Sequence, residues 1–283
     1  MENAPKLNRS ILAILAVIVG LYMVAVAPFL IQTSVERVVS ALVAGGKPAY
    51  ASGILLFSYF FPMYRGLIFI GGVTLILLAP WISKGKEWTF PVGLLASAFP
   101  SAGGMFMLMP YVSFIKGFPL PFAVSLVGLL FFWSFIFLRK VDKWVKWGQF
   151  LALTFSGMLT THALITGTGN MRVLLTRPDK PMYAGLGEWV LAWSAPIQWI
   201  SAILLFIAIY LIAARKFSGW WLALTAVVSL ALMDISMQVI RLTMTDSTSW
   251  DYSYGLPMII GLLFALLFPK FRNALVKEKE PAG

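Results

Sequence analysis

The chain has 283 residues, of which 60% are hydrophobic and only 12% are charged, with 22 Lys and Arg residues against 11 Asp and Glu. A soluble domain carries about 25% charged residues, so this composition indicates a membrane protein. The chain has no Cys and one His, which excludes disulfides, thiolate metal sites, iron–sulfur ligation and a haem held by two of its own histidines. The net charge of +11 does not indicate nucleic-acid binding, because the cations lie at the ends of apolar runs and no nucleic-acid-binding motif is present.

Apolar runs follow one another along the whole chain. A helix needs about 20 apolar residues to cross a hydrocarbon core, so these runs predict an all-α integral membrane fold. We expect one transmembrane domain, residues 1–283, built as a polytopic bundle of about eight transmembrane helices. The expected spans are 11–31, 66–83, 91–113, 121–138, 148–166, 190–213, 220–243 and 253–269. The first run could imitate a signal peptide, but its apolar residues continue through Ile31, so we expect it to be retained as a helix.

Two long loops, 34–65 and 167–189, are expected on the same side of the membrane. The first should contain a short helix lying at the membrane interface, because apolar residues recur there at helical spacing: Val35, Val38, Val39 and Leu42. The apolar run 54–61 is too short to span and stops at Pro62. Residues 53–83 therefore form either a re-entrant segment followed by a span or one helix kinked at the proline.

The basic residues predict an orientation. Most of the 22 Lys and Arg residues fall on the side that holds both chain ends, most clearly in the short loop 139–146. This bias places both termini in the cytoplasm of a membrane that we expect to be a prokaryotic plasma membrane, with anionic lipids around the basic loops. The two long loops then lie outside, where they could contact protein partners.

Polar residues inside the seventh run are the main functional signal. Asp234, Gln238 and Arg241 fall at i, i+4 and i+7, so they share one face of a helix. An acid at this depth needs a protein partner or a water-filled cavity. At 1.5 Å per residue, Asp234, His162 and Gln198 all lie about 21–22 Å from the cytoplasmic ends of their helices. We therefore expect a polar pocket between the fifth, sixth and seventh spans, open to the outside.

Simpler interpretations of these residues remain open. His162 could donate a hydrogen bond within the protein that serves structure only. Asp234 could likewise form a purely structural pair with either His162 or Arg241. Arg241 could also extend its side chain to water at the helix end. The segment 167–172 resembles part of a dinucleotide-binding loop, but no strand precedes it and its last glycine is missing. No metal-ligand spacing is present.

Three functions fit these features. The preferred one is a membrane-embedded subunit of a larger, respiratory-type complex that binds a lipid-like ligand such as a quinone in the predicted pocket. Asp234 or His162 would accept a proton from the ligand, and Gln198 or Arg241 would orient its oxygen. In layout alone, the eight spans resemble the haem-free quinol-oxidising anchor subunits of molybdoenzyme complexes. No other cofactor is expected, and the chain alone is not expected to be catalytic.

The first alternative is a small-solute or proton-coupled transporter, since intramembrane Asp, His and Arg are common along transport pathways. Against it, the cytoplasmic halves of the spans carry few polar residues, and no internal repeat of the kind common in transporters is visible. The second alternative is an intramembrane enzyme acting on lipid. It lacks paired carboxylates, a metal cluster and a phosphate-binding loop.

Overall fold

The computed structural model describes residues 5–47, 50–176, 184–245 and 250–276. In these ranges the chain is helical and contains no strand. The helices of the first half are α1 (Lys6–Ala25), α2 (Ala27–Ala44), α3 (Ala51–Ser83), α4 (Thr89–Phe114) and α5 (Leu120–Phe137). Those of the second half are α6 (Lys143–Thr176), α7 (Gly185–Ala213), α8 (Phe217–Met244), the 3-10 turn η3 (Ser253–Gly255), α9 (Leu256–Leu267) and α10 (Pro269–Leu275).

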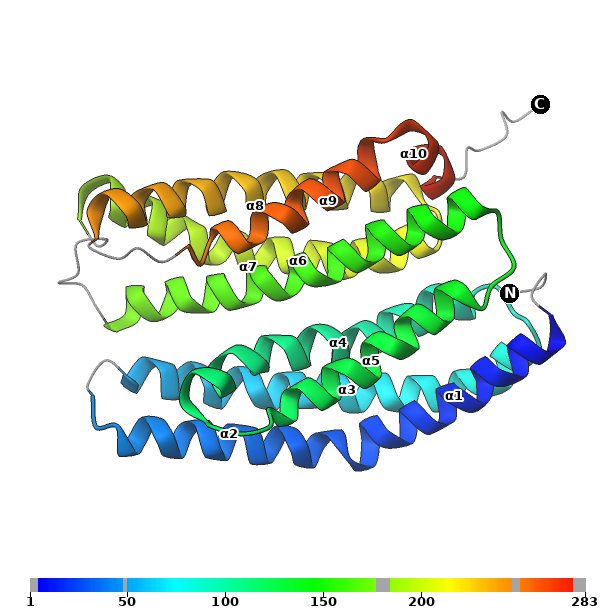
Figure 1. The fold of residues 1–283 in the computed structure, drawn as a ribbon, viewed down its shortest axis with the longest axis horizontal. Coiled ribbons are helices and arrows are strands. Elements are labelled where there is room, and N and C mark those ends of the chain that lie inside the picture. Colours follow the sequence, from blue (N-terminus) through cyan, green and yellow to red (C-terminus); the bar gives the residue numbers. More distant parts are fainter. Residues whose placement is uncertain (1–4, 48–49, 177–183, 246–249, 277–283) are drawn as a thin grey trace.

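The helices form two elongated layers that lie side by side (Figure 1). In the first half, α3 packs between the α1–α2 segment and α4, and α5 packs on α4 and returns to α1 and α2. In the second half, α6, α7, α8 and α9 close a similar ring, with α9 packing on both α8 and α6. Each half is thus an antiparallel four-helix arrangement with short connections. Helix α4 joins the halves by packing against α6 and α7.

The fold is that of a polytopic membrane protein. Among the described residues, seven helical segments are long and apolar enough to cross a membrane. The bent pair formed by Ser253–Leu267 and Pro269–Leu275 makes an eighth if it is one span. The bend of 76° follows from Pro269, because proline cannot continue a helix but is well suited to begin one.

Much of what the sequence assigned to loops is helical. The helix expected at the interface in 34–65 is the second part of a 39-residue segment, Lys6–Ala44. Its residues Val35, Val38 and Leu42 are buried in the hydrophobic core, so it packs against the bundle instead of lying apart. Helix α3 runs unbroken through Pro62, which selects the single-helix alternative for 53–83.

The expected outer loop 167–189 is shortened in the same way, because α6 continues to Thr176. Glycine lowers helix stability by about 1 kcal/mol, so a helix is not expected from sequence to continue past Gly167. In the structure, a Cβ added to Gly167 would lie 2.8 Å from Trp199 Cδ1 on α7. The glycine therefore serves close packing between α6 and α7, and this packing carries the helix past it.

One end of the molecule holds the starts of α1 and α6, the α3–α4 and α7–α8 connections, and α10 (Figure 1). We call it the basic end, because it holds the cations Lys6, Arg9, Lys84, Lys86, Arg139, Lys140, Lys143, Lys146, Arg215, Lys216, Lys270 and Arg272. The remaining end is called the opposite end.

Arg139 ties the two halves together at the basic end. Its guanidinium lies 3.5 Å from the centre of the Phe90 ring on α4 and donates to Gln149 Oε1 of α6 at 3.1 Å. Gln149 Nε2 in turn donates to the carbonyls of Ile212 and Ala213 at the end of α7. Burial lowers the pKa of Arg139 to about 10, which still leaves it charged at neutral pH.

Candidate functional site

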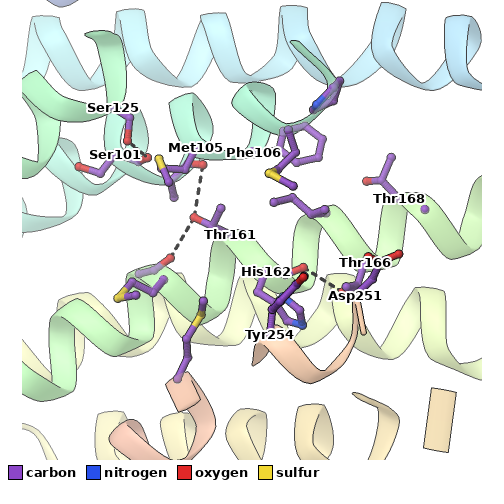
Figure 2. Close-up of a pocket in the computed structure, with 18 of the residues that line it drawn as sticks. Ser101, Met105, Phe106, Ser125, Thr161, His162, Thr166, Thr168, Asp251 and Tyr254 are labelled. Atoms are coloured by element: carbon purple, nitrogen blue, oxygen red, sulfur yellow. Dashed lines mark hydrogen bonds between the residues drawn. The ribbon is translucent and has the colours of Figure 1, made fainter. Parts of the chain in front are cut away.

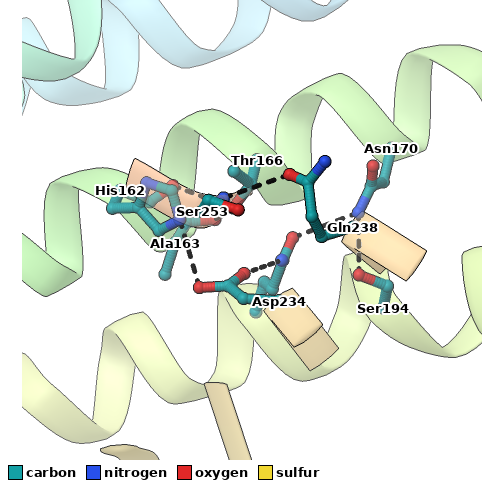
Figure 3. A network of polar contacts seen from close by, with 9 residues as sticks. His162, Ala163, Thr166, Asn170, Ser194, Asp234, Gln238 and Ser253 are labelled. Atoms are coloured by element: carbon teal, nitrogen blue, oxygen red, sulfur yellow. Dashed lines mark hydrogen bonds and ion pairs between the residues drawn. The ribbon is translucent and has the colours of Figure 1, made fainter. Parts of the chain in front are cut away.

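Asp234 lies at the centre of a buried polar network in the second half (Figure 3). Helix α8 places its carboxylate between α6 and α7, where the residue is only 1% exposed. Gln198 Nε2 on α7 donates to Oδ1 at 3.0 Å, and His162 Nε2 on α6 lies 3.1 Å from Oδ2. Each carboxylate oxygen therefore has a partner, as a buried acid requires.

The network extends from Gln198 toward the opposite end. Asn170 Nδ2 donates to Ser194 Oγ at 2.7 Å and to Gln198 Oε1 at 3.3 Å. The Tyr252 hydroxyl donates to Asn170 Oδ1. Burial raises the pKa of Tyr252 above its ordinary value, so it remains a neutral donor at physiological pH. These bonds connect α6, α7 and the segment before η3 into one polar seam.

The turn η3 covers the His162–Asp234 pair. A Cβ added to Gly255 would lie 2.5 Å from Asp234 Oδ2 and 2.6 Å from His162 Nε2, so only glycine lets the backbone come this close. The turn is held by Gln238, whose Oε1 accepts a hydrogen bond from the Ser253 amide at 3.2 Å. Gln238 thus positions the cover.

The five predicted site residues separate into three groups. His162, Gln198 and Asp234 are brought together, Gln238 holds η3, and Arg241 lies at the edge of the network, next to Tyr252 and away from Asp234. Arg241 Nη1 is 3.2 Å from Asp251 Oδ2 in a partly exposed ion pair, and it also hydrogen-bonds Tyr252. Of the two structural pairs that the sequence allowed for Asp234, the structure contains the one with His162.

A cavity of about 870 Å³ lies between the two halves of the molecule (Figure 2). One side is formed by α3, α4 and α5, and the other by α6, the end of α8 at Arg241, η3 with the residues before it, and α9. Residues of α6 line it from Leu153 to Val173, a distance of about 30 Å along the helix axis. The cavity is therefore long and narrow, with a shape suited to a chain.

The two ends of this cavity differ in polarity. Toward the basic end it is lined mainly by apolar side chains, among them Leu129, Phe132 and Leu153. Toward the opposite end, apolar residues of α3 and α4 such as Phe57 and Phe114 still line one side. The second half contributes the polar residues there: Thr166, Thr168, Arg172, Arg241, Asp251, Tyr252 and Tyr254. Four methionines line the cavity as well, and their flexible thioethers can adapt to ligands of different shape: Met105, Met109, Met158 and Met258.

The expected position of the pocket is corrected by this geometry. The space between α6, α7 and α8 is filled by the polar network, and the cavity lies on the other side of α6. Of the predicted residues, His162 and Arg241 line the cavity, whereas Asp234, Gln198 and Gln238 do not. Helical spacing fixed the depth of these side chains, but it could not show which side of α6 is filled.

His162 connects the two regions. Its Nε2 contacts Asp234 in the seam, and the residue also lines the cavity. A histidine held by a carboxylate through one ring nitrogen can exchange a proton through the other. This arrangement can therefore perform acid–base chemistry on a molecule in the cavity.

Sequence reasoning missed Asn170, Tyr252 and Gly255. Asn170 follows Thr166 by four residues and His162 by eight, so the three share one helix face. This spacing would have revealed Asn170 had the helix been extended past residue 166. Tyr252 and Gly255 lie in a short segment without periodicity, and no local pattern identifies them. Within the described part of the chain, no group of three His, Cys, Asp or Glu residues could hold a metal ion.

Comparison with protein-family models, with curated proteins and with solved structures finds no match to this chain.

Proposed function

We propose that the protein is a membrane-embedded subunit that binds a lipid-like ligand, of which a quinone is the best example, in the cavity between its two halves. The observation that carries this proposal is the combination of a long apolar cavity with one buried histidine in its wall, backed by a carboxylate. Ligand sites typically combine an apolar lining with a few convergent polar groups in a volume of about 300–1,000 Å³.

The polarity of the cavity orients the ligand. A hydrocarbon tail fits the lining near Phe132 and Leu153, and the polar head lies level with His162 and Thr166. His162 accepts a proton from the hydroxyl of a quinol, and Asp234 stabilises the resulting imidazolium. Gln198 holds Asp234 in place through its 3.0 Å hydrogen bond. Gln198 and Asp234 act through His162, since neither lines the cavity.

A partner protein follows from this chemistry. Oxidation of a quinol releases electrons as well as protons. With no Cys and one His, the chain cannot ligate an iron–sulfur cluster or a bis-histidine haem by itself. The electrons then pass to a partner subunit, bound at the opposite end where the polar part of the cavity lies.

The orientation belongs to the same proposal. The clustered cations place the basic end, and with it both termini, on the cytoplasmic side of a prokaryotic plasma membrane. Anionic lipids surround that end. The opposite end, with Arg241 and the polar part of the cavity, then faces outward.

A ligand-binding experiment tests the proposal. The purified protein is placed in lipid nanodiscs and titrated with decylubiquinone while its melting temperature is measured. A ligand at 100 times its dissociation constant stabilises the folded state by about 2.7 kcal/mol, so the melting temperature should rise. Protein purified with native lipids should also retain a prenyl quinone that organic extraction and mass spectrometry detect.

Two glycine substitutions provide a matched pair. A Cβ at Gly157 or at Gly66 meets no atom within 4 Å, and only Gly157 lines the cavity. Gly157→Leu should abolish the decylubiquinone shift, whereas Gly66→Leu, with the same gain in helix propensity, should retain it. An equal shift in both variants, or no shift in the unmodified protein, would contradict the proposal.

A further inference from the structure

We infer that the cavity opens sideways into the bilayer, between α5 and α9, and that its ligand enters from the lipid and not from water. This inference rests on the proposed function, because it concerns the origin of the ligand of that same site. It narrows the ligand to molecules that reside in the membrane: amphiphiles with a hydrocarbon chain that dissolve in the bilayer.

Exposed apolar residues inside the cavity wall mark the opening. Leu126 of α5 is 40% exposed and Met158 of α6 is 43% exposed, and both line the cavity. Met158 lies about 22 Å along α6 from its start at Lys143, so it is far from either end of that 34-residue helix. A surface at this depth faces hydrocarbon in a core about 30 Å thick.

The packing of the helices places the opening. Helix α5 packs on α4 and on the α1–α2 segment, and it meets α6 near the basic end, where Trp133 and Phe137 contact Phe150. Helix α9 packs on α6, α8 and α10. Both helices contribute lining residues, Leu126 and Leu129 from α5 and Met258 from α9. Helix α6 lies between them as the floor, with Gly157 and Met158 on its surface. The walls of the opening are therefore α5 and α9.

The chemistry of the rim suits passage of a hydrocarbon chain. Leu126, Met158 and Met258 carry no charge, and methionine side chains rearrange easily around a passing group. The charged residues of the cavity lie instead at its opposite end, where Arg241 and Asp251 form their ion pair. A chain entering between α5 and α9 crosses a surface without charged residues, whose polar groups are hydroxyls such as those of Ser125 and Thr161. The ion pair need not open.

The absence of cysteine makes a direct test simple, because any introduced cysteine is unique. A spin label is attached to the Met158→Cys variant in liposomes. The frequency of its collisions with oxygen, which concentrates in the bilayer, is compared with the frequency of its collisions with a water-soluble nickel chelate. Two further variants serve as standards: Leu130→Cys for a lipid-facing site outside the cavity, and Lys140→Cys for an exposed site at the basic end.

The label at position 158 should behave like that at position 130, with frequent oxygen collisions and few nickel collisions. Frequent nickel collisions would show a water-filled opening, and protection from both reagents would show a closed one. Either result overturns the inference. The outcome is separate from the binding titration: decylubiquinone binding with nickel access at position 158 refutes only the sideways opening, and oxygen access without binding refutes only the proposed function.

Discussion

The two halves of the molecule differ in what holds their own helices together. In the first half, helices approach through small residues: a Cβ added to Gly72 would lie 2.7 Å from Met23 Cβ and 2.8 Å from the Gly20 carbonyl. In the second half, a hydrogen-bonded seam around Asp234 joins α6, α7 and α8. Close packing of small residues is a common solution between membrane helices, whereas a buried acid is costly and usually functional.

This difference assigns a role to each half. The first half supplies an apolar scaffold and one wall of the cavity. The second half supplies the other wall, in which His162 is held by a carboxylate. Chemistry is therefore expected to depend on substitutions in the second half, whereas substitutions in the tight contacts of the first half should change stability alone.

The largest loss of stability is expected for Asp234→Ala. The substitution would leave the buried His162 and Gln198 side chains without their acceptor, and each buried group left unpaired costs about 1–3 kcal/mol. Asp234→Asn keeps the shape and one acceptor oxygen, so its loss should be closer to about 1–3 kcal/mol. Thermal unfolding in detergent measures both variants. Equal melting temperatures for Asp234→Ala and the unmodified protein would show that the network does not hold the second half.

The matching substitution in the first half is Gly72→Leu. Overpacking a tight contact costs about 1–3 kcal/mol, so the melting temperature should fall while decylubiquinone still raises it. Gly66→Leu on the same helix is the control and should not be destabilised, since a Cβ there meets nothing within 4 Å. Loss of ligand binding in a folded Gly72→Leu protein would remove the proposed division between the halves.

A smaller change in stability is expected for Gly255→Ala, with a clear effect on the site. The added methyl group would displace η3 from the His162–Asp234 pair, at a cost of about 1 kcal/mol or more. Binding of decylubiquinone should weaken, because His162 changes position in the cavity wall. Titration of the melting temperature measures both effects. If the Gly255→Ala variant binds as tightly as the unmodified protein, the position of η3 does not matter to the ligand.

The smallest effect is expected for Arg241→Gln. The Arg241 and Asp251 side chains are 26% and 55% exposed, and such ion pairs contribute about 0–1 kcal/mol. At low salt, Arg241→Gln should have a slightly lower melting temperature than the unmodified protein, and high salt should remove this difference. A large loss that persists in high salt would mean that Arg241 belongs to the buried network.

Counting residues along apolar runs predicted much of this arrangement. Depth along a helix is set by 1.5 Å per residue, and this placed His162, Gln198 and Asp234 in one layer. The end of α6 was wrong, because the fit of Gly167 against Trp199 depends on a helix distant in sequence. The location of the cavity was wrong for the same reason: which side of α6 is filled depends on Asn170 and Tyr252.

The most direct test is an experimental density map of the protein kept in its native lipids. We predict an elongated density along α6, from the level of Leu153 past His162 toward Arg172, with its narrow end toward the basic end. A map in which side chains close this space, or in which a ligand lies between α6, α7 and α8, would contradict it.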